Sequence, residues 1–188
     1  MTIESPNRTH AMRTLGAAAT ALVLTLAAPL QAHAGDLVQP KQLIADSRLS
    51  ATQLARLVTP AREYDTFWTT GDEALARAAL APEFTDRTLP PGRPQGIAGP
   101  LAASKAFHAA VPDVHCEVEQ MIVAGDRVIT HLRFTGHFTG TFNGVAGHGQ
   151  PVDFIATDIY RIQDGKIAEN WHIEDNLTFL QQLGVVKG

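Results

Sequence analysis

Two aspartates near the C-terminal end of the chain have surroundings that favour proton transfer. Strand alternation places Asp158 on one face with Phe154 and Tyr160. Asp175 has the same parity as Trp171, at the point where the last predicted strand gives way to a helix. A carboxylate beside an apolar wall loses hydration, so its pKa rises toward values that are useful for exchanging protons with a substrate. Carboxylates placed in this way are candidates for an apolar pocket enclosed by the sheet and its helices.

Each candidate carboxylate also has a purely structural interpretation. Asp175 directly precedes a predicted helix, where it would cap the free amides of the first turn and have a lowered pKa. Asp158 could instead pair with an arginine on a neighbouring strand, for example Arg133. Asp86 lies beside a loop rich in proline and glycine, residues 89–96, which could form the lip of a site. Asp86 is therefore either a pocket residue or a carboxylate that stabilises a turn.

The histidines predict hydrogen bonding rather than metal binding. His131 and His137 share a strand face, but six residues of strand would separate them by roughly 20 Å, too far to share one ion. No pair of histidines has the spacing of four residues that is found on zinc-hydrolase helices. His131, Arg133 and His137 are thus weaker pocket candidates, and exposed or core positions are the alternative. His172 has the opposite parity to Trp171 and is expected to point away. No metal and no cofactor is expected.

The order of elements that would position these residues predicts an α+β fold, with helices first, then an antiparallel sheet, then a closing helix. A capping box at Ser50–Gln53 predicts the start of the first helix, which is interrupted or kinked at Pro60 and ends at Gly71. Tyr64 and Trp68 lie on its apolar face, either in the core or closing a pocket. Further helices are predicted over 72–81, 100–110 and 176–183, and strands over 83–88, 114–123, 127–135, 152–162 and 166–173, with a bulged strand pair or long turn over 136–150.

Composition and charge narrow the classes of function. The chain has 188 residues, of which 45% are hydrophobic and 18% charged, as is usual for one globular domain. Its net charge of −4 predicts no basic surface for phosphates, so a nucleic-acid partner is not expected. Cys116 is the one cysteine, which excludes a disulfide within the chain.

The first 34 residues are typical of a secretory signal. Arg8 and Arg13 precede an uncharged apolar run over residues 14–30, and Ala32-His33-Ala34 resembles a cleavage site. A membrane anchor is the alternative, although the run is short for a span. We therefore expect a cleaved signal peptide over 1–34, an N-terminal arm over 35–49 and one domain over 50–188. The mature protein would be periplasmic or secreted, with no membrane association after cleavage.

An ordered set of short motifs runs through the chain from about Tyr64 to Val185. The motifs are Gly71-Asp72, Leu80–Asp86, Val111-Pro112-Asp113, Gly125–Val128, Gly136–Gly140 and Ile159–Trp171, followed by Asp175. In this set the chain resembles the SnoaL-like polyketide cyclases of the nuclear-transport-factor-2-like fold. The resemblance implies a cone, in which a bent mixed sheet and three helices enclose a pocket, with a short C-terminal helix. It also implies that a homodimer is one expected assembly.

The resemblance also implies residue roles and a reaction class. Asp175 matches the acid/base of the cyclases, which removes a proton from an activated carbon before the enolate closes on a carbonyl. Asp158 precedes Arg161 by three residues, as does a cavity-facing acid in the related ketosteroid isomerases, and would polarise the carbonyl. Trp171 would supply the apolar wall beside Asp175. The residues expected to hold the substrate are Trp171, Phe154, Tyr160, Tyr64 and Trp68, with Asp86, His131, Arg133 and His137 as further candidates.

Three functions therefore remain open from the sequence. The leading one is a cofactor-independent cyclase or isomerase that acts on a small hydrophobic carbonyl compound. The second is an exported protein of the same fold that binds a small apolar molecule without catalysis. The third is a dimerising scaffold whose cone is filled by its own side chains. Fold alone does not decide among them.

Overall fold

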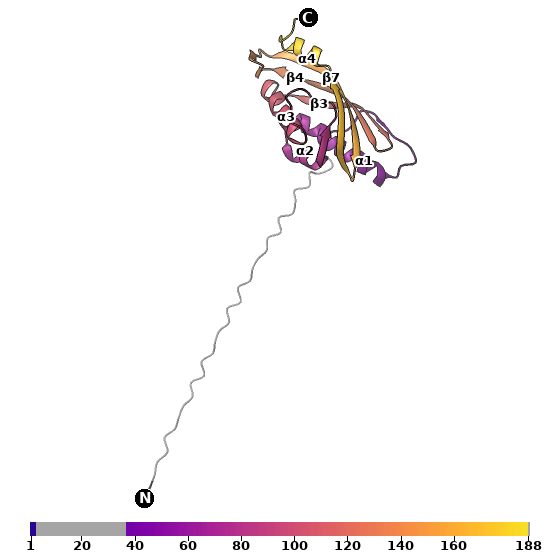
Figure 1. Cartoon of the computed structure of the whole chain (residues 1–188), viewed down its shortest axis with the longest axis vertical. Helices are drawn as coiled ribbons and strands as arrows, with labels where there is room; N and C mark the ends of the chain where they lie inside the picture. Colours follow the sequence, from indigo (N-terminus) through magenta and orange to yellow (C-terminus); the bar gives the residue numbers. More distant parts are fainter. Residues whose placement is uncertain (3–36, 188) are drawn as a thin grey trace. The chain divides into compact units, whose positions relative to one another are not determined.

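The computed structural model describes residues 1–2 and 37–187 of the chain (Figure 1). Apart from residues 1–2, the predicted signal peptide lies outside these residues, as does its cleavage site, so both stay predictions. Within residues 37–187, none of the helices combines the length and the apolar character that a membrane span requires.

The first helix begins and ends where the sequence predicts. In α1 (Ala51–Thr70), the Ser50 hydroxyl accepts from the Gln53 amide at 3.3 Å and the Gln53 side chain accepts from the Ser50 amide at 2.9 Å. These bonds satisfy two amides at the helix start. Gly71 ends the helix in the left-handed conformation, with φ 68°. Pro60 lies inside α1, which continues as one helix, so the interruption that was one of the two alternatives at this residue is absent.

Strands and helices follow the predicted α+β order, and the predicted fold class is confirmed. Between residues 37 and 187 a mixed sheet has the strand order β1-β3-β4-β7-β8-β2, with a small separate hairpin, β5-β6. The other helices are α2 (Glu73–Ala79), α3 (Ala98–Ala110) and α4 (Asn176–Gln182). The strands are β1 (Leu43–Ile44), β2 (Leu80–Asp86), β3 (His115–Ala124), β4 (Arg127–Phe138), β5 (Thr141–Phe142), β6 (Val145–Ala146), β7 (Gln150–Gln163) and β8 (Lys166–Glu174).

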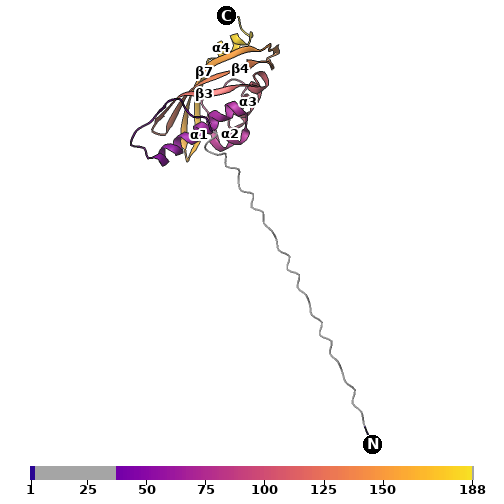
Figure 2. The same ribbon diagram turned by 180° about the vertical axis from the view of Figure 1, so that it is seen from behind.

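Helices α1, α2 and α3 cover one face of the curved sheet. Figure 1 views the long strands from one side, and Figure 2 shows the three helices in front of them from the other. Alternation along β4 and β7 turns Phe134, Phe154 and Tyr160 toward these helices. The ring of Tyr64 on α1 lies 5.8 Å from that of Tyr160, and Phe107 on α3 lies 5.7 Å from Phe134. The core therefore forms between the sheet and the helices.

The segment before α1, which the sequence predicts to be an N-terminal arm outside the domain, is fixed to the domain. The Val38 amide donates to the Thr66 hydroxyl at 2.9 Å, and the Arg62 guanidinium donates to the Val38 carbonyl at 2.8 Å. Leu37 is buried, and β1 adds a short parallel strand beside β3. Side chains of α1 bond to the backbone of this segment and β1 pairs with β3, and these long-range contacts, which no periodicity in the sequence encodes, hold the segment in place.

Gly140 allows the end of β4 to approach α3. Its amide donates to the Ala110 carbonyl at 2.9 Å, and a Cβ at this position would lie 1.8 Å from the Ala109 carbonyl oxygen. Only glycine fits such an approach. The contact matters for the cavity because α3 and the adjoining hairpin carry the rings of Phe107 and Phe142.

Replacing Gly140 by alanine should destabilise the domain, because the new methyl group overlaps backbone that cannot move aside. We expect Gly140→Ala to lower the free energy of unfolding by about 3 kcal/mol, measured by denaturant titration. Gly144→Ala is the matched control, because Gly144 has φ +81° and no atom lies within 4 Å of the added Cβ. It should cost about 1 kcal/mol, from backbone strain alone. Equal losses in the two variants would show that the approach to α3 is not tightly packed.

Candidate functional site

A cavity of about 310 Å³ lies between the inner face of the sheet and the helices. One part of its lining is aromatic and the other is polar, as in ligand sites that combine an apolar wall with a few placed polar groups. The aromatic side chains are Tyr64, Trp68, Phe84, Phe107, Phe134, Phe142, Phe154 and Phe179. The polar side chains are Asp86, Arg93, Asp158, Asn170, His172, Glu174 and Asn176.

The aromatic wall is a continuous packed cluster. Phe154 on β7 lies 5.2 Å from Phe134 on β4 and 4.9 Å from Phe179 on α4, measured between ring centroids. Phe107 on α3 lies 5.5 Å from Phe179. Rings at these separations pack favourably and hold one another in place. The cavity therefore offers a rigid apolar surface for a flat, ring-bearing ligand.

The polar wall is built by the pairing of β7 with β8. Asp158 lies directly opposite His172, and Ala156 lies opposite Glu174. Directly paired residues of antiparallel strands point to the same face. His172 and Glu174 consequently enter the cavity beside Asp158.

A bulge in β8 decides which of its side chains face inward. The tight turn at Asp164-Gly165, with positive φ at both residues, sets Ile162 opposite Ile167. The next pair is Arg161 with Glu169, so Ala168 is an extra residue. Without this extra residue the ladder would place Trp171 opposite Asp158. The bulge exchanges the two faces of β8 beyond it and brings His172 inward instead.

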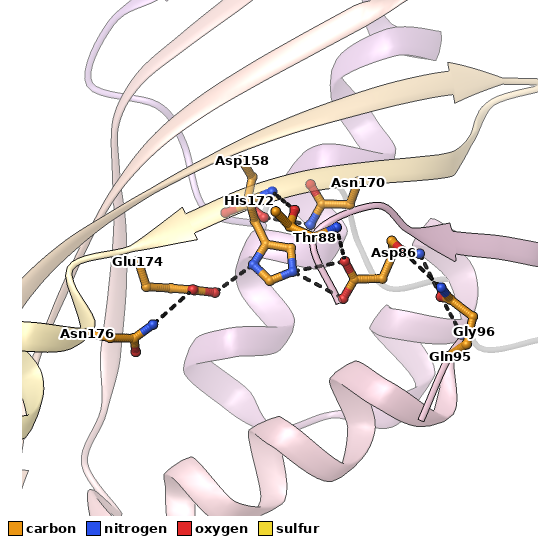
Figure 3. Close-up of polar contacts among 9 residues, drawn as sticks. All are labelled: Asp86, Thr88, Gln95, Gly96, Asp158, Asn170, His172, Glu174 and Asn176. Carbon is orange, nitrogen blue, oxygen red and sulfur yellow. Dashed lines mark hydrogen bonds and ion pairs between the residues drawn. The ribbon is translucent and has the colours of Figure 1, made fainter. Parts of the chain in front are cut away.

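His172 is held between two carboxylates (Figure 3). Its Nδ1 lies 2.7 Å from Glu174 Oε1, and its Nε2 lies 3.1 Å from both carboxylate oxygens of Asp86. Burial opposes the charged imidazolium, but the hydrogen bond and charge of Glu174, with the charge of Asp158 and the bond to Asp86, outweigh it and raise the pKa of His172 to about 9. The ring is therefore a buried cation at neutral pH.

Asp158 is the carboxyl whose environment best suits a proton acceptor near neutrality. It is 7% exposed, and burial raises its pKa to about 6, although the hydrogen bond from Asn170 and the charge of His172 oppose the rise. Asn170 Nδ2 donates to Asp158 Oδ1 at 2.6 Å. Asp158 Oδ2 has no hydrogen-bond partner among the described residues, and it is not one of the fully buried polar atoms. One carboxylate oxygen is thus anchored and the other faces the cavity.

Asp86 combines its two predicted roles. Its Oδ1 accepts from the Thr88 amide at 2.8 Å, which is the predicted stabilisation of a turn, and the same carboxylate contacts His172 in the cavity. The Gln95 side chain bonds to the amide and the carbonyl of Asp86 at 2.7 and 2.9 Å (Figure 3). These two bonds tie the loop over residues 89–96 to the end of β2.

The structure brings together five of the residues that the sequence nominated. Asp86 and Asp158 meet at the polar wall, and Tyr64, Trp68 and Phe154 contribute to the aromatic wall. Asp158 does not pair with Arg133, which instead binds Asp153 at 2.5 Å.

Asp175 lies outside the cavity and caps α4. Its Oδ1 accepts from the Thr178 amide at 3.0 Å and its Oδ2 from the Thr178 hydroxyl at 2.7 Å. The bond from the Thr178 backbone, followed by the bond from its side chain, lowers the pKa of the exposed Asp175 carboxyl. The geometry favours the capping interpretation over the catalytic one, because both carboxylate oxygens are engaged at the helix start and Asp175 does not line the cavity.

Two aromatic residues predicted to contact substrate do not line the cavity. Trp171 lies on the opposite face of β8 because of the bulge, where the Arg127 guanidinium stands 5.4 Å from its ring. Tyr160 points inward but is buried behind the cavity, where its hydroxyl donates to Asp65 Oδ1 at 2.7 Å. Tyr64 lies against Tyr160 and provides the ring that reaches the cavity.

The three weaker candidates on β4 are also outside the cavity. His131 lies 2.9 Å from the Thr157 hydroxyl, and His137 lies 2.7 Å from Asp113. Arg133 forms its pair with Asp153 at the surface. All three have the opposite parity to Leu132 and Phe134, which face the core. The predicted sharing of a face was correct, but it is the outer face.

Sequence reasoning missed the principal charged group of the site. His172 was expected to point away, because regular alternation from Trp171 was followed without the bulge. Asn170 and Glu174, which share its parity, were missed for the same reason. The signal available was the clustering of three polar residues at alternate positions in a strand that ends against an apolar helix.

Comparisons with known proteins agree with the fold. The family model described as SnoaL-like polyketide cyclase matches residues 59–183. A proposed polyketide cyclase from Bacillus cereus is 42% identical, with a TM-score of 0.72 over 80% of this chain and 95% of that chain. IdmH, a proposed polyketide cyclase from Streptomyces antibioticus, is 29% identical, with a TM-score of 0.60 over 66% of this chain and 96% of that chain. No match was found among curated proteins.

The charge of His172 can be measured directly. We expect its imidazole resonances to titrate near pH 9 in NMR spectra, because the flanking carboxylates favour the charged ring. Glu174→Gln should lower this pKa, since Glu174 contributes the largest favourable interaction. Glu83→Gln, which removes an exposed carboxylate of β2, is the control and should leave it unchanged. A wild-type titration near 6.5 would contradict the arrangement.

Proposed function

This chain belongs to the SnoaL-like polyketide cyclase family, and we propose that it is a cofactor-independent acid/base enzyme of the cyclase or isomerase type. Its substrate would be a small, ring-bearing carbonyl compound. The observation that carries this proposal is the meeting of a buried carboxyl, Asp158, with a buried cation, His172, at one apolar cavity.

Asp158 would accept a proton from the carbon next to the substrate carbonyl. Its free oxygen, Oδ2, faces the cavity, and with a pKa of about 6 the group is mostly ionised at neutral pH yet basic enough to act. The electrons of the broken C–H bond pass into the enolate, so the carbonyl oxygen gains negative charge. The proton on Asp158 then returns either to another carbon, which completes an isomerisation, or to the alkoxide formed when the enolate closes on a second carbonyl.

His172 would stabilise the enolate through its charge rather than by donating a hydrogen bond. Both ring nitrogens are already engaged, by Glu174 and by Asp86. The imidazolium therefore stays fixed in place and charged throughout the reaction. A fixed positive charge in a largely apolar cavity stabilises developing negative charge more strongly than water would.

The aromatic wall supports a flat substrate of limited size. A volume of about 310 Å³ lies at the small end of the range for small-molecule sites and is large enough for a body of fused rings. Packing of such rings against Phe134 and Phe154 would exclude water from the reacting carbon. A protein that binds the ligand without catalysis would use the same wall. Proton exchange is therefore the measurement that distinguishes catalysis from binding.

Proton abstraction can be tested without knowing the natural substrate. We expect the wild-type protein to accelerate exchange of the α-protons of 2-tetralone in D₂O, followed by ¹H NMR. Asp158→Asn should reduce the protein-dependent rate by on the order of 10² or more, because it removes the base and preserves the shape.

Asp175→Asn is the matched control for this experiment, because asparagine also caps helices well. It should retain the wild-type exchange rate. Loss of exchange in Asp175→Asn but not in Asp158→Asn would assign the base to the residue that the sequence first suggested. No acceleration by the wild-type protein would favour a binding function.

Asp158→Asn should also stabilise the fold at alkaline pH. The pKa of Asp158 is raised on folding, so its contribution to stability falls as pH rises from about 4 to about 6 and stays unfavourable above that. At pH 8 we expect Asp158→Asn to increase the free energy of unfolding by on the order of 2–3 kcal/mol, with a smaller gain at pH 4.5.

Asp153→Asn is a control of opposite sign for the stability measurement. The pKa of Asp153 is lowered, chiefly by its hydrogen bond to Arg133, so this group stabilises the fold above the unfolded pKa. Its substitution should lower the denaturation midpoint at pH 8. A loss of stability in Asp158→Asn at pH 8 would show that the carboxylate is well compensated in the cavity.

A further inference from the structure

One charged side chain at the cavity has no role in the proposed proton transfer. Arg93 lies in the loop between β2 and α3, is half-buried, and contributes to the cavity lining. Its side chain makes no hydrogen bond or ion pair with any residue in the described part of the chain. Of the arginines between residues 37 and 187, Arg56 shares this property, but Arg56 is exposed on the surface of α1. A half-buried guanidinium that faces a cavity and has no partner is unusual. Arginine has several hydrogen-bond donors, and burying a donor without a partner costs free energy.

The position of Arg93 is built into the backbone around it. The Arg93 amide donates to the Pro90 carbonyl at 3.1 Å in a tight turn. Gly99, near the start of α3, leaves room for the loop: a Cβ there would lie 2.5 Å from the Pro94 carbonyl oxygen and 3.4 Å from Cγ of Arg93. Together with the two bonds from Gln95 to Asp86, these contacts hold the aliphatic part of Arg93 against the helix. The guanidinium is thereby presented at the cavity.

The carboxylates that share the cavity do not satisfy Arg93. Glu174 is bound to His172 at 2.7 Å, and Asp86 is bound to the same ring, whereas Asp158 is anchored by Asn170. Burial favours the neutral form of Glu174, but the bond and charge of His172 outweigh it, and the charge of Arg93 adds to the lowering of the Glu174 pKa. Arg93 is therefore near enough to act on Glu174 electrostatically, but it lies beyond ion-pair distance and its donors stay available.

We propose that Arg93 binds an acidic group of the substrate, so that the preferred substrates are ring-bearing carbonyl compounds that also carry a carboxylate. Guanidinium and carboxylate match as two parallel hydrogen bonds, a geometry that fixes orientation as well as adding affinity. The carboxylate would bind at the loop while the rings pack on the aromatic wall. This pose would leave the ketone and its α-carbon at the polar wall, where Asp158 and His172 line the cavity. The inference rests on the proposed function in that it takes this cavity as the substrate site.

A pair of matched probes tests this inference by isothermal titration calorimetry. The probes are 6-acetyl-2-naphthoate and 2-acetylnaphthalene, which share the rings and the ketone and differ in the carboxylate. We expect the wild-type protein to bind the carboxylate probe at least tenfold more tightly. Arg93→Gln should abolish that preference and retain binding of the neutral probe. Arg93→Lys should keep part of the preference, because lysine preserves the charge but not the planar fork.

Arg56→Gln is the matched control, since it removes the other unpartnered arginine and the same unit of charge from the surface. It should leave both affinities unchanged, and thermal melting of each variant should show that it is folded. Equal affinity of the wild-type protein for the two probes, or a preference that survives in Arg93→Gln, would overturn the role of Arg93 and leave the cavity as a site for neutral ligands. Binding of neither probe would overturn the proposed function together with this inference.

Discussion

The pairing of β7 with β8 beyond the bulge at Ala168 is the constraint on which the chemistry of the cavity depends. It places His172 opposite Asp158, and it turns Trp171 to the outer face. A single extra residue has this effect because side chains in a strand alternate strictly between the two faces. The rest of the site follows from this register, since Asp86 and Asn170 can contact His172 and Asp158 only when those two side chains point inward.

Burial favours the neutral forms of Asp158 and His172, whereas the opposite charges nearby favour the ionised forms. Which effect dominates the pKa differs between the two residues. Asp158 has one hydrogen-bond donor, so desolvation dominates and its pKa rises to about 6. His172 has carboxylates at both ring nitrogens, so their charge dominates and its pKa rises to about 9. Between these values the site holds a carboxylate and an imidazolium side by side. Ionised Asp158 is costly to stability there, whereas the charge of His172 contributes to stability.

The aromatic cluster and the close backbone approaches make the site rigid. Gly140 brings α3 against the end of β4, and Gly99 brings the loop over residues 89–96 against the start of α3. Each approach depends on the absence of a side chain, so the cavity walls are fixed by backbone contacts as well as by ring packing. A rigid wall opposite Asp158 would limit the orientations that a bound ring can adopt, and limited orientation is what positions one carbon at the base.

The sequence by itself determined the α+β order, the start of α1 at its capping box and the family, because all of these depend on short-range patterns. It also identified Asp86, Asp158, Tyr64, Trp68 and Phe154 as cavity residues. Only the tertiary structure decided that His172 enters the cavity and that Asp175 caps a helix. The physical reason is that the faces of β8 depend on a one-residue bulge, whose position is set by long-range strand pairing rather than by local sequence.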